Sequence, residues 1–528
     1  MSKGESVDRR RAIKRTVALG VSMGTLGAMN SGPLRANEFE SIKTAIKPSN
    51  PIADLVIVGA GNAGIPAAIQ AADLGVRVLL VDKNPFIGGM LNISGGHISG
   101  ADSKLQIEKG IEDSPALHYR DAMRMGKYSN NSELLKIAVE NAAAMIDWLA
   151  EIGVEFTPES PFFEDDHEHY SSARTYMGPD YGRSLLGPLR TELEKRIERG
   201  DIKLLLSAKV TKLLQDDSGT VTGIAVDDDS GKASDFMAKA VILTTGGYGA
   251  SQVLKEKYNP KIAKSKVVCL PHASGDGLIM AQQAGAELIN MDHFVSFPGA
   301  IDGARGRLMF PPKHYPQGIW VNKQGERFVN EHAINPDERE RAFLAQTDFG
   351  YFMILDKKSK INNEIGVKGW DQQQLERQVS SGIVKKAQSI RGLGRKMGIP
   401  VQQLVKTVAE YNQSVVTGID ENFHRQRLDS PIDEGPFYSI PITGSILISH
   451  GGVAVNHLLQ AVESSGKVID GLYAAGETIG SAQMMGTAVL SGMSVGPAIT
   501  LGRIAARNAC QYTQSQDSRV ASCLITET

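Results

Sequence analysis

The sequence is poor in cysteine and has no excess of charge of either sign. Its 528 residues include only three cysteines, Cys269, Cys510 and Cys523, and no CxxC pair. A disulfide scaffold, a zinc ribbon and a c-type haem attachment site are therefore excluded. Lys and Arg number 57 against 59 Asp and Glu, a formal net charge of −2, so no basic surplus is available to neutralise nucleic-acid phosphates.

Glycine, in contrast, is abundant, at 55 of 528 residues, above the usual ~7%. Glycine concentrates where the backbone must approach a ligand closely or adopt a positive φ angle. Hydrophobic residues make up 41% of the chain, which is typical of a folded globular protein. The length predicts two to four domains of roughly 100–200 residues each.

The first forty residues have the composition of an export signal. Residues 8–14 read Asp-Arg-Arg-Arg-Ala-Ile-Lys, no acidic residue occurs from 15 to 37, and residues 17–29 are weakly apolar. This apolar run is shorter than the ~20 residues needed to cross a bilayer, so no stable membrane span is expected. We predict a twin-arginine signal at residues 1–36 and a periplasmic protein exported with its cofactor bound. A basic tail on a cytoplasmic protein is the alternative.

A dinucleotide-binding pattern follows this segment. Residues 54–58 (Asp-Leu-Val-Ile-Val) are typical of a strand buried on both faces, and the turn Gly59-Ala-Gly-Asn-Ala-Gly64 comes directly after them. A helical segment then ends near Gly75, and residues 77–81 predict a second strand ending at Asp82. Strand, glycine turn, helix and acid together make the full fingerprint of a dinucleotide site.

Each position of the glycine turn has a physical role. Gly59 permits the tight turn, Gly61 lets backbone N–H groups approach a pyrophosphate, and Gly64 lets the helix pack on the strand. Ala60 and Ala63 complete the loop at the helix N-terminus, whose partial positive charge favours phosphates.

The acid and further glycines indicate FAD. Asp82 is placed to accept a hydrogen bond from the adenosine ribose, and its charge disfavours NADP. Gly88-Gly89 and Ser94-Gly95-Gly96 follow the second strand, where an FAD protein runs its backbone along the pyrophosphate and the flavin. Thr244-Thr245-Gly246-Gly247 and Gly471–Glu477 each repeat the pattern of strand and glycine.

With these motifs in place, the chain resembles the flavoprotein family of fumarate reductase and succinate dehydrogenase flavoprotein subunits, which also holds urocanate reductase, L-aspartate oxidase and 3-ketosteroid dehydrogenases. The resemblance covers about residues 50–510 and rests on these motifs: Ser94-Gly-Gly, Gly110–Ser114, Asn141–Leu149, Ala273–Gly277, Asn322–Glu331, His450–Gly452 and Gly471–Glu477.

The resemblance implies an α/β fold with a Rossmann-like FAD-binding domain of the GR2 type, assembled from both chain ends, and an inserted α+β capping domain. The implied boundaries are 50–296 and 448–512 for the FAD-binding domain, 297–447 for the capping domain and 513–528 for a C-terminal tail. The active site is expected between the two domains, at the flavin.

The resemblance also implies a set of cofactor contacts beyond the glycine turn. They are Gly88, Gly89, Ser94, Gly95, Gly96, Val210, Thr245, Gly246, Asp276, His450, Gly476, Glu477, Gly492, Ser494 and Val495. The histidine that carries flavin in succinate dehydrogenases precedes the glycine pair, whereas His97 follows Gly95-Gly96. Non-covalent FAD is therefore expected.

The chain departs from the family where fumarate reductases hold the two substrate carboxylates. Phe297 stands in place of a histidine, Val489 in place of an arginine, and His314 in place of the proton-donating arginine. Because desolvated carboxylates need charged partners, these departures imply a substrate other than a C4 dicarboxylate. The ending at residues 496–505 resembles the ketosteroid dehydrogenases, although Ala488 replaces the tyrosine used there.

Histidines are the candidates for proton transfer. His314 is the first candidate by position, and Tyr315 beside it is the second. His450, next to glycines expected under the flavin, is predicted to donate to the N1–C2=O region of the ring, with a structural hydrogen bond to the backbone as the alternative. His97 is a weaker candidate of the same kind. The acidic and histidine-rich run at residues 164–169 is interpreted as a solvated loop, and no metal site is predicted.

Together these residues predict an exported FAD-dependent oxidoreductase that reduces or forms a C=C bond conjugated with a carbonyl or carboxyl group. Flavin N5 would exchange the hydride and a side chain the proton. A small molecule is the expected substrate, and a separate cytochrome or quinone-linked carrier is the expected electron partner. A 3-ketosteroid-type dehydrogenase and a non-catalytic electron-relay subunit remain as alternatives.

Overall fold

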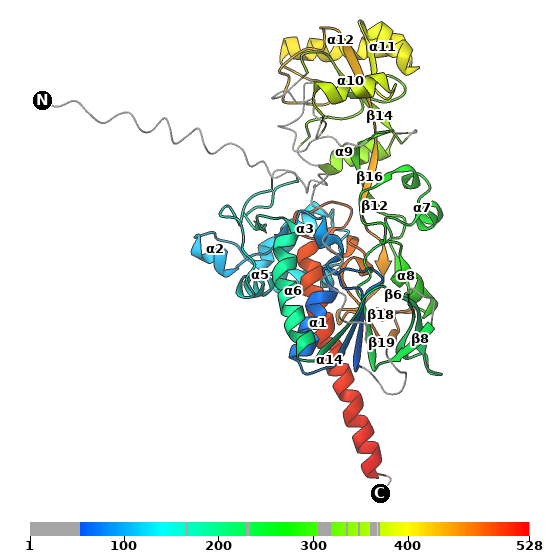
Figure 1. Ribbon diagram of the computed structural model, residues 1–528. Helices are drawn as coiled ribbons and strands as arrows, with labels where there is room; N and C mark the ends of the chain where they lie inside the picture. The colour runs from blue at the N-terminus through cyan, green and yellow to red at the C-terminus, as the bar shows by residue number, and fades with distance from the viewer. Residues whose placement is uncertain are drawn as a thin grey trace, which may run out of the picture.

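The chain folds into a body and a cap that are joined by two long strands (Figure 1). The computed structural model describes residues 53–164, 167–228, 233–304, 318–333, 336–346, 349–359, 367 and 370–526. The predicted signal at residues 1–36 lies outside them. In the described part of the chain, no helix combines the length and apolar character that a bilayer crossing requires.

The body is built on a six-stranded sheet of order β18-β19-β9-β1-β2-β5. β19, β9, β1, β2 and β5 run parallel, and only β18 is antiparallel to its neighbour. Every residue of β1, β2 and β9 is buried, as expected for strands covered on both faces. The strands are β1 (Leu55–Val58), β2 (Val78–Val81), β5 (Ile202–Leu205), β9 (Ala240–Leu243), β18 (Gln460–Val462) and β19 (Val468–Ala474).

Both ends of the chain contribute to this sheet, which confirms the predicted assembly. β19, from the last part of the chain, pairs with β9 through Leu472 and Val241, and β9 pairs with β1 through Ala240 and Leu55. Helix α14 (Val495–Thr526) packs along α1 (Gly64–Asp73) beside the sheet.

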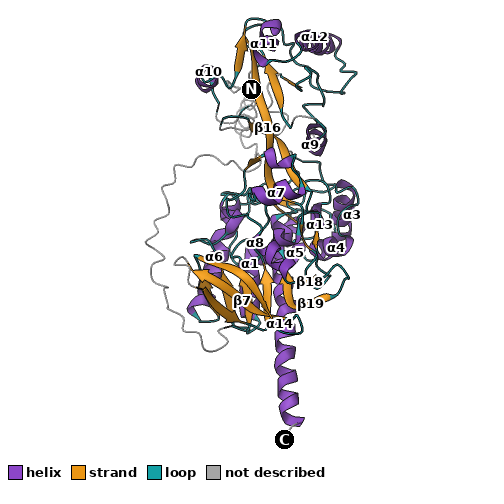
Figure 2. Cartoon of the chain, turned by 90° about the vertical axis from the view of Figure 1, so that its right-hand side faces the viewer, coloured by secondary structure: helices purple, strands orange, loops and turns teal. Residues whose placement is uncertain are grey.

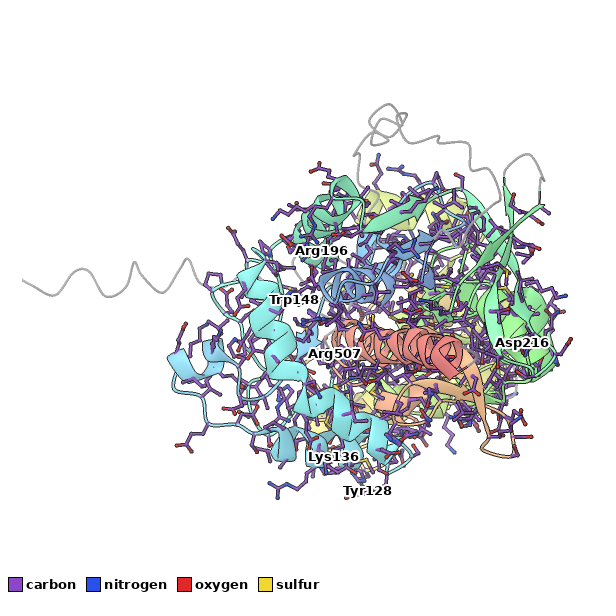
Figure 3. The ribbon with its side chains drawn as sticks, turned by 90° about the horizontal axis from the view of Figure 1, so that it is seen from below. Tyr128, Lys136, Trp148, Arg196, Asp216 and Arg507 are labelled. Carbon is purple, nitrogen blue, oxygen red and sulfur yellow. The ribbon has the colours of Figure 1, made fainter. Side chains whose placement is uncertain are left out.

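Helix α14 also projects beyond the body at the end opposite the cap, and Figure 3 looks along it. It runs without a break through the predicted boundary between residues 512 and 513. Where it crosses the body, the Arg503 guanidinium lies 4.0 Å from the ring centroid of Trp148. This cation–π contact ties α14 to helix α5 (Ala142–Glu151).

Shorter elements surround the sheet. The helices are α2 (Lys104–Glu108), α3 (Pro115–Met125), α4 (Ser132–Glu140), α6 (Gly182–Glu198), α7 (Gln252–Tyr258), α8 (Asp276–Gln283) and α13 (Ala482–Met485), with 3₁₀ turns η2 (Gly89–Asn92), η3 (Ile262–Lys264) and η5 (Gly476–Ile479). The strands are β3 (Ile98–Ser99), β4 (Thr175–Tyr176), β6 (Ala208–Gln215), β7 (Val221–Asp228), β8 (Ala233–Met237), β11 (Leu288–Ile289) and β17 (Gly452–Val453).

The cap has its own sheet, which continues into the body through β16 (Figure 2). β12 and β16 pair antiparallel, and the predicted boundaries at 296/297 and 447/448 fall inside this ribbon, where Phe297 lies opposite Ser445. The elements of the ribbon and the cap are β12 (Phe294–Ile301), β13 (Ile319–Val321), α9 (Pro336–Leu344), β14 (Tyr351–Leu355), α10 (Gln372–Ser380), β15 (Lys385–Ala387), α11 (Ile390–Met397), α12 (Val401–Thr417) and β16 (Phe437–Ser449), and β10 (Lys266–Val267) pairs with β16 from the body.

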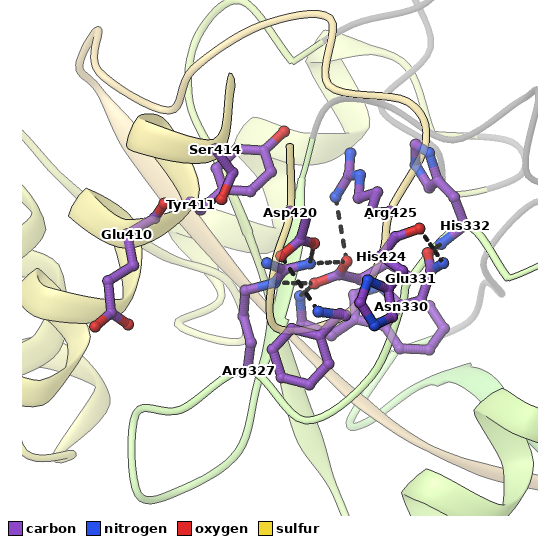
Figure 4. A network of polar contacts seen from close by, with 12 residues as sticks. Arg327, Asn330, Glu331, His332, Glu410, Tyr411, Ser414, Asp420, His424 and Arg425 are labelled. Carbon is purple, nitrogen blue, oxygen red and sulfur yellow. Dashed lines mark hydrogen bonds and ion pairs between the residues drawn. The ribbon is translucent and has the colours of Figure 1, made fainter. Parts of the chain in front are cut away.

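A buried ionic network fixes the cap (Figure 4). Arg327 binds the Glu331 carboxylate through two hydrogen bonds of 2.9 and 2.8 Å, and it also donates to Asp420. Arg425 Nη1 lies 3.3 Å from the same Glu331 carboxylate. Burial by itself would raise the pKa of Glu331, but the charges of Arg327 and Arg425 outweigh it and lower the pKa to about 2.

Candidate functional site

A cavity of about 990 Å³ runs from the strand ends of the body to the cap. Its body side is lined by the ends of β1, β2 and β9 and by glycine turns, the position where open α/β sheets bind ligands. Its cap side is lined by side chains that include Phe297, Trp370 and Gln374.

The glycine turn after β1 forms one end of this cavity, and close packing explains its glycines. Gly59 has φ +108°, and a Cβ there would lie 2.4 Å from the Thr244 carbonyl oxygen. A Cβ on Gly64 would lie 1.8 Å from the Gly59 oxygen, so α1 can approach the strand only without one. Ala63 caps α1 with no side-chain acceptor, and in the first turn Ile65 N–H donates to the Gly61 carbonyl while Pro66 has no N–H to offer.

Hydrogen bonds of Asp82 join the end of strand β2 to the glycine turn. Its Oδ2 accepts a hydrogen bond of 2.8 Å from the Ala60 N–H, and its Oδ1 accepts from the backbone and side chain of Asn84. The carboxylate is buried yet lines the cavity. It therefore holds the loop in place and faces the space predicted for the ribose.

Most of the predicted cofactor contacts meet along this cavity. Its lining includes Gly59, Gly61, Ala63, Asp82, Gly89, Ser94, Gly95, Gly96, Val210, Thr245, Gly246, Asp276, Gly476, Glu477, Gly492, Ser494 and Val495. Ala60, Gly64, Gly88 and His450 are not among the lining residues. Ala60 and Gly64 support the turn from behind, as their contacts with Asp82 and Gly59 show.

Of the predicted proton-transfer residues His314, Tyr315 and His450, only His450 is among the described residues. His314 and Tyr315 lie outside the described residues. His450 is buried behind the cavity wall, where its Nε2 has no hydrogen-bond partner among the described residues. Burial and the nearby His293 lower the pKa of His450 to about 3, so its imidazole is neutral at pH 7.

The cap end of the cavity has an apolar wall. Val295, Phe297 and Val489 form one buried cluster, against which Leu447 packs. Phe297 and Val489, two of the three positions that depart from the fumarate reductases, therefore belong to one cluster. In the described part of the chain no arginine lines the cavity.

A second wall of the cavity is polar, and the sequence interpretation of residues 164–169 as a solvated loop was wrong for two of them. Glu164 and His167 are only 5% and 3% exposed. His97 Nδ1 lies 3.3 Å from Glu164 Oε2, and both His97 and His167 line the cavity. Burial, with smaller contributions from the neighbouring His97 and Arg339, lowers the pKa of His167 to about 3. Over the described residues, no group of three His, Cys, Asp or Glu side chains is arranged to hold a metal ion.

The family model described as FAD binding domain matches residues 54–495. The chain belongs to this FAD-binding family. It is an FAD-dependent oxidoreductase, and the residues at the cavity fit the cofactor: Gly61 and Gly89 line it with backbone alone, and the Asp82 carboxylate lines it at the end of the second strand.

Relatives of known activity cover most of this flavoprotein. It is 32% identical to "Fumarate reductase (cytochrome)" of Shewanella frigidimarina over 87% of the chain and 77% of that protein. It is 31% identical to "Urocanate reductase" of Eggerthella lenta over 91% of the chain and 79% of that protein. The fold matches a 3-ketosteroid delta1-dehydrogenase of Sterolibacterium denitrificans with a TM-score of 0.76 at 22% identity, over 87% of this chain and 99% of that one. These matches confirm the family and fold that the motifs predict.

Two charged residues of cap helix α9 were missed by the sequence reasoning. Arg339, buried at 1% exposure, lies beside His167, and Asp337 Oδ1 accepts a hydrogen bond of 3.1 Å from the Val489 N–H. Burial raises the pKa of Asp337 to about 6. In the sequence both residues belong to the charged run Asp337–Arg341, which is typical of a solvated helix face. Only their proximity to His167 and Val489, which are distant in the sequence, distinguishes these two residues from solvated ones.

Proposed function

We propose that this flavoprotein reduces or forms a C=C bond conjugated with a carbonyl or carboxyl group, in a substrate that is not a C4 dicarboxylate. The observation that carries the proposal is the apolar cluster of Val295, Phe297 and Val489 at the cap end of the cavity. A second substrate carboxylate against this cluster would be buried among apolar side chains, and Lys266, which lines the cavity nearby, already donates to the Ile301 and Ala304 carbonyls. The named activities of the two relatives, reduction of fumarate and of urocanate, favour the reductive direction.

The side chains around the cavity have different roles in the proposed reaction. FAD, when bound, exchanges the hydride at flavin N5. Phe297, Val489 and Trp370 exclude water and hold the apolar body of the substrate. His314, with Tyr315 as the second candidate, remains the proposed source of the proton.

The substrate experiment is anaerobic reoxidation of the reduced holoenzyme. A panel of α,β-unsaturated acids, esters, enones and steroids is mixed with the reduced flavin, and the return of the oxidised flavin spectrum is followed. Rapid reoxidation by at least one unsaturated acid or ketone is expected. If no conjugated C=C compound reoxidises the flavin, the proposal is wrong and the electron-relay alternative is favoured.

FAD is proposed to be bound without a covalent link, since His97 follows the glycine pair Gly95-Gly96. Acid precipitation should release all of the yellow colour into the supernatant. Colour that stays in the pellet would contradict the proposal.

The electron partner and the location belong to the same proposal. A separate cytochrome or quinone-linked carrier is proposed, in line with the cytochrome named for the Shewanella relative. Export to the periplasm by the twin-arginine pathway rests on the sequence of residues 1–36. Replacing Arg9, Arg10 and Arg11 by lysine should leave the flavoprotein in the cytoplasm, and unchanged periplasmic recovery would exclude this route.

A further inference from the structure

The histidines of the polar wall have no part in the function proposed so far. His97 lines the cavity directly after the glycines Gly95-Gly96, and His167 lines it from a loop far away in the sequence. Nothing in the nucleotide fingerprint requires either ring. The positions and hydrogen-bonding capacity of these two imidazoles can therefore indicate which polar groups the substrate carries.

The environment of His97 fixes the position of its ring. Nδ1 lies 3.3 Å from Glu164 Oε2, and the two side chains are 11% and 4% exposed. Phe162 packs edge-on against the imidazole, with ring centroids 6.1 Å apart and planes at 76°. Burial lowers the pKa of His97 to about 4, so the imidazole is neutral at pH 7 and carries one proton on its two nitrogens.

The carboxylate decides which nitrogen holds that proton. A proton on Nδ1 faces a Glu164 oxygen, whereas a lone pair on Nδ1 would face the lone pairs of that oxygen. Nε2 therefore keeps its lone pair and acts as an acceptor. Nε2 is buried and has no hydrogen-bond partner among the described residues. A buried acceptor of this kind is stabilised by a donor and repels a carboxylate.

We propose that His97, oriented by Glu164, forms a subsite that accepts a hydrogen bond from an O–H or N–H group of the substrate. The inference rests on the proposed function and narrows its substrate class. The substrate is a conjugated acid or ketone that carries a hydroxyl or a ring N–H group, such as a hydroxyaryl or azole acrylate. His167, also neutral and beside His97, bounds the subsite without adding a charge.

Binding to the oxidised holoenzyme tests the subsite without turnover. The probes are 3-(4-hydroxyphenyl)propanoate and its 4-methoxy analogue, which differ in one donor hydrogen, and Kd is read from the change in flavin absorption. The wild-type protein should bind the hydroxyl compound about tenfold more tightly than the methoxy compound. A ratio within about twofold would overturn the proposal.

Two variants and one control assign the preference to His97. In His97→Phe the acceptor is lost. In Glu164→Gln the amide can donate to Nδ1, which moves the imidazole proton to Nε2 and turns the acceptor into a donor. Both variants should bring the ratio to within about twofold, whereas His169→Phe, in the exposed part of the same loop, should keep it. An unchanged ratio in both variants would overturn the proposal.

The flavin is the other possible source of the donor, through its N3–H group. In that case His97→Phe would alter the flavin spectrum of the ligand-free protein and leave the hydroxyl-to-methoxy ratio unchanged, which also overturns the proposal. Failure of the proposed function is a separate result, because it is seen as absence of flavin reoxidation and not in Kd. A flavin-to-protein ratio equal to that of the wild type shows that each variant is folded.

Discussion

The two ends of the cavity are built in different ways. At the nucleotide end the protein presents backbone: Gly59 and Gly64 pack so closely that any side chain would collide with a neighbouring carbonyl. At the substrate end it presents side chains, the apolar cluster around Phe297 and Val489 and the polar pair of His97 and Glu164. Backbone recognition depends on a short local motif, whereas side-chain recognition is assembled from segments far apart in the sequence.

The largest effect is expected at the nucleotide end, from Gly64→Ala. The added Cβ would lie 1.8 Å from the Gly59 oxygen, so α1 must move away from β1 and the glycine turn must open. Purified protein should lose nearly all of its flavin, seen as the ratio of flavin to protein absorbance. The matched control is Gly392→Ala in α11, where the atoms nearest to the added Cβ would be Ser389 Oγ at 3.2 Å and Ala387 Cβ at 3.4 Å and alanine favours the helix. Full flavin content in Gly64→Ala would show that this end is not fixed by close packing.

Breaking the ionic network of the cap should lower the free energy of unfolding without releasing flavin from the nucleotide end. Glu331→Gln removes the carboxylate shared by Arg327 and Arg425, so Arg425 loses its buried ion pair while Arg327 keeps Asp420, and the loss costs about 3–5 kcal/mol of unfolding free energy. Flavin content should stay unchanged. The exposed-pair control, Glu376→Gln, breaks the contact with Lys386 and should cost less than about 1 kcal/mol. Equal losses of unfolding free energy in both variants would contradict the stabilising role of the buried network.

The same network predicts an acid dependence. The pKa of Glu331 in the folded protein, about 2, is below its ordinary value of 4.5, so its stabilising effect is complete above that ordinary value. The effect is lost as the pH falls from about 4.5 towards 2. Denaturant unfolding between pH 6 and pH 3 should therefore show the wild type approaching Glu331→Gln at low pH. A constant difference between the two proteins would contradict the lowered pKa.

A smaller effect is expected from Asp82→Ala. The change removes the acceptor for the Ala60 N–H and the hydrogen bond predicted to the ribose. A charge-assisted hydrogen bond contributes about 1.5–3 kcal/mol, so the Kd for FAD should rise roughly ten- to hundredfold. Asp216→Ala, in an exposed turn, is the control for loss of one negative charge. Unchanged FAD retention on dilution would remove the ribose assignment.

Local elements of the fold could be predicted from the sequence because each is determined by neighbouring residues. The strand at Ala240–Leu243 and the helix end near Gly75 lie where their patterns indicate. The limits of the cap were harder to place, because β12 and β16 cross from body to cap as one ribbon and no turn or linker marks the border.

The substrate end could be predicted only in part. The replacements at Phe297 and Val489 were visible in the sequence, and the structure shows that they pack together. The sequence predicted Glu164 and His167 to be solvated. Their burial comes from His97 and from cap helix α9, and neither is near them in the chain. Arg339 was missed for the same reason.

The central claim is that the substrate end rejects a second carboxylate, and one comparison of rates tests it. With reduced methyl viologen as the electron donor, kcat/KM is measured for fumarate and for an aromatic acrylate and an enone of similar size. Burying an unpaired carboxylate costs several kcal/mol, and a cost of about 4 kcal/mol corresponds to a loss of roughly a thousandfold. We predict that fumarate falls below the best singly charged or neutral substrate by about this factor. Turnover of fumarate at a rate typical of efficient enzymes, with a micromolar KM, would contradict the account.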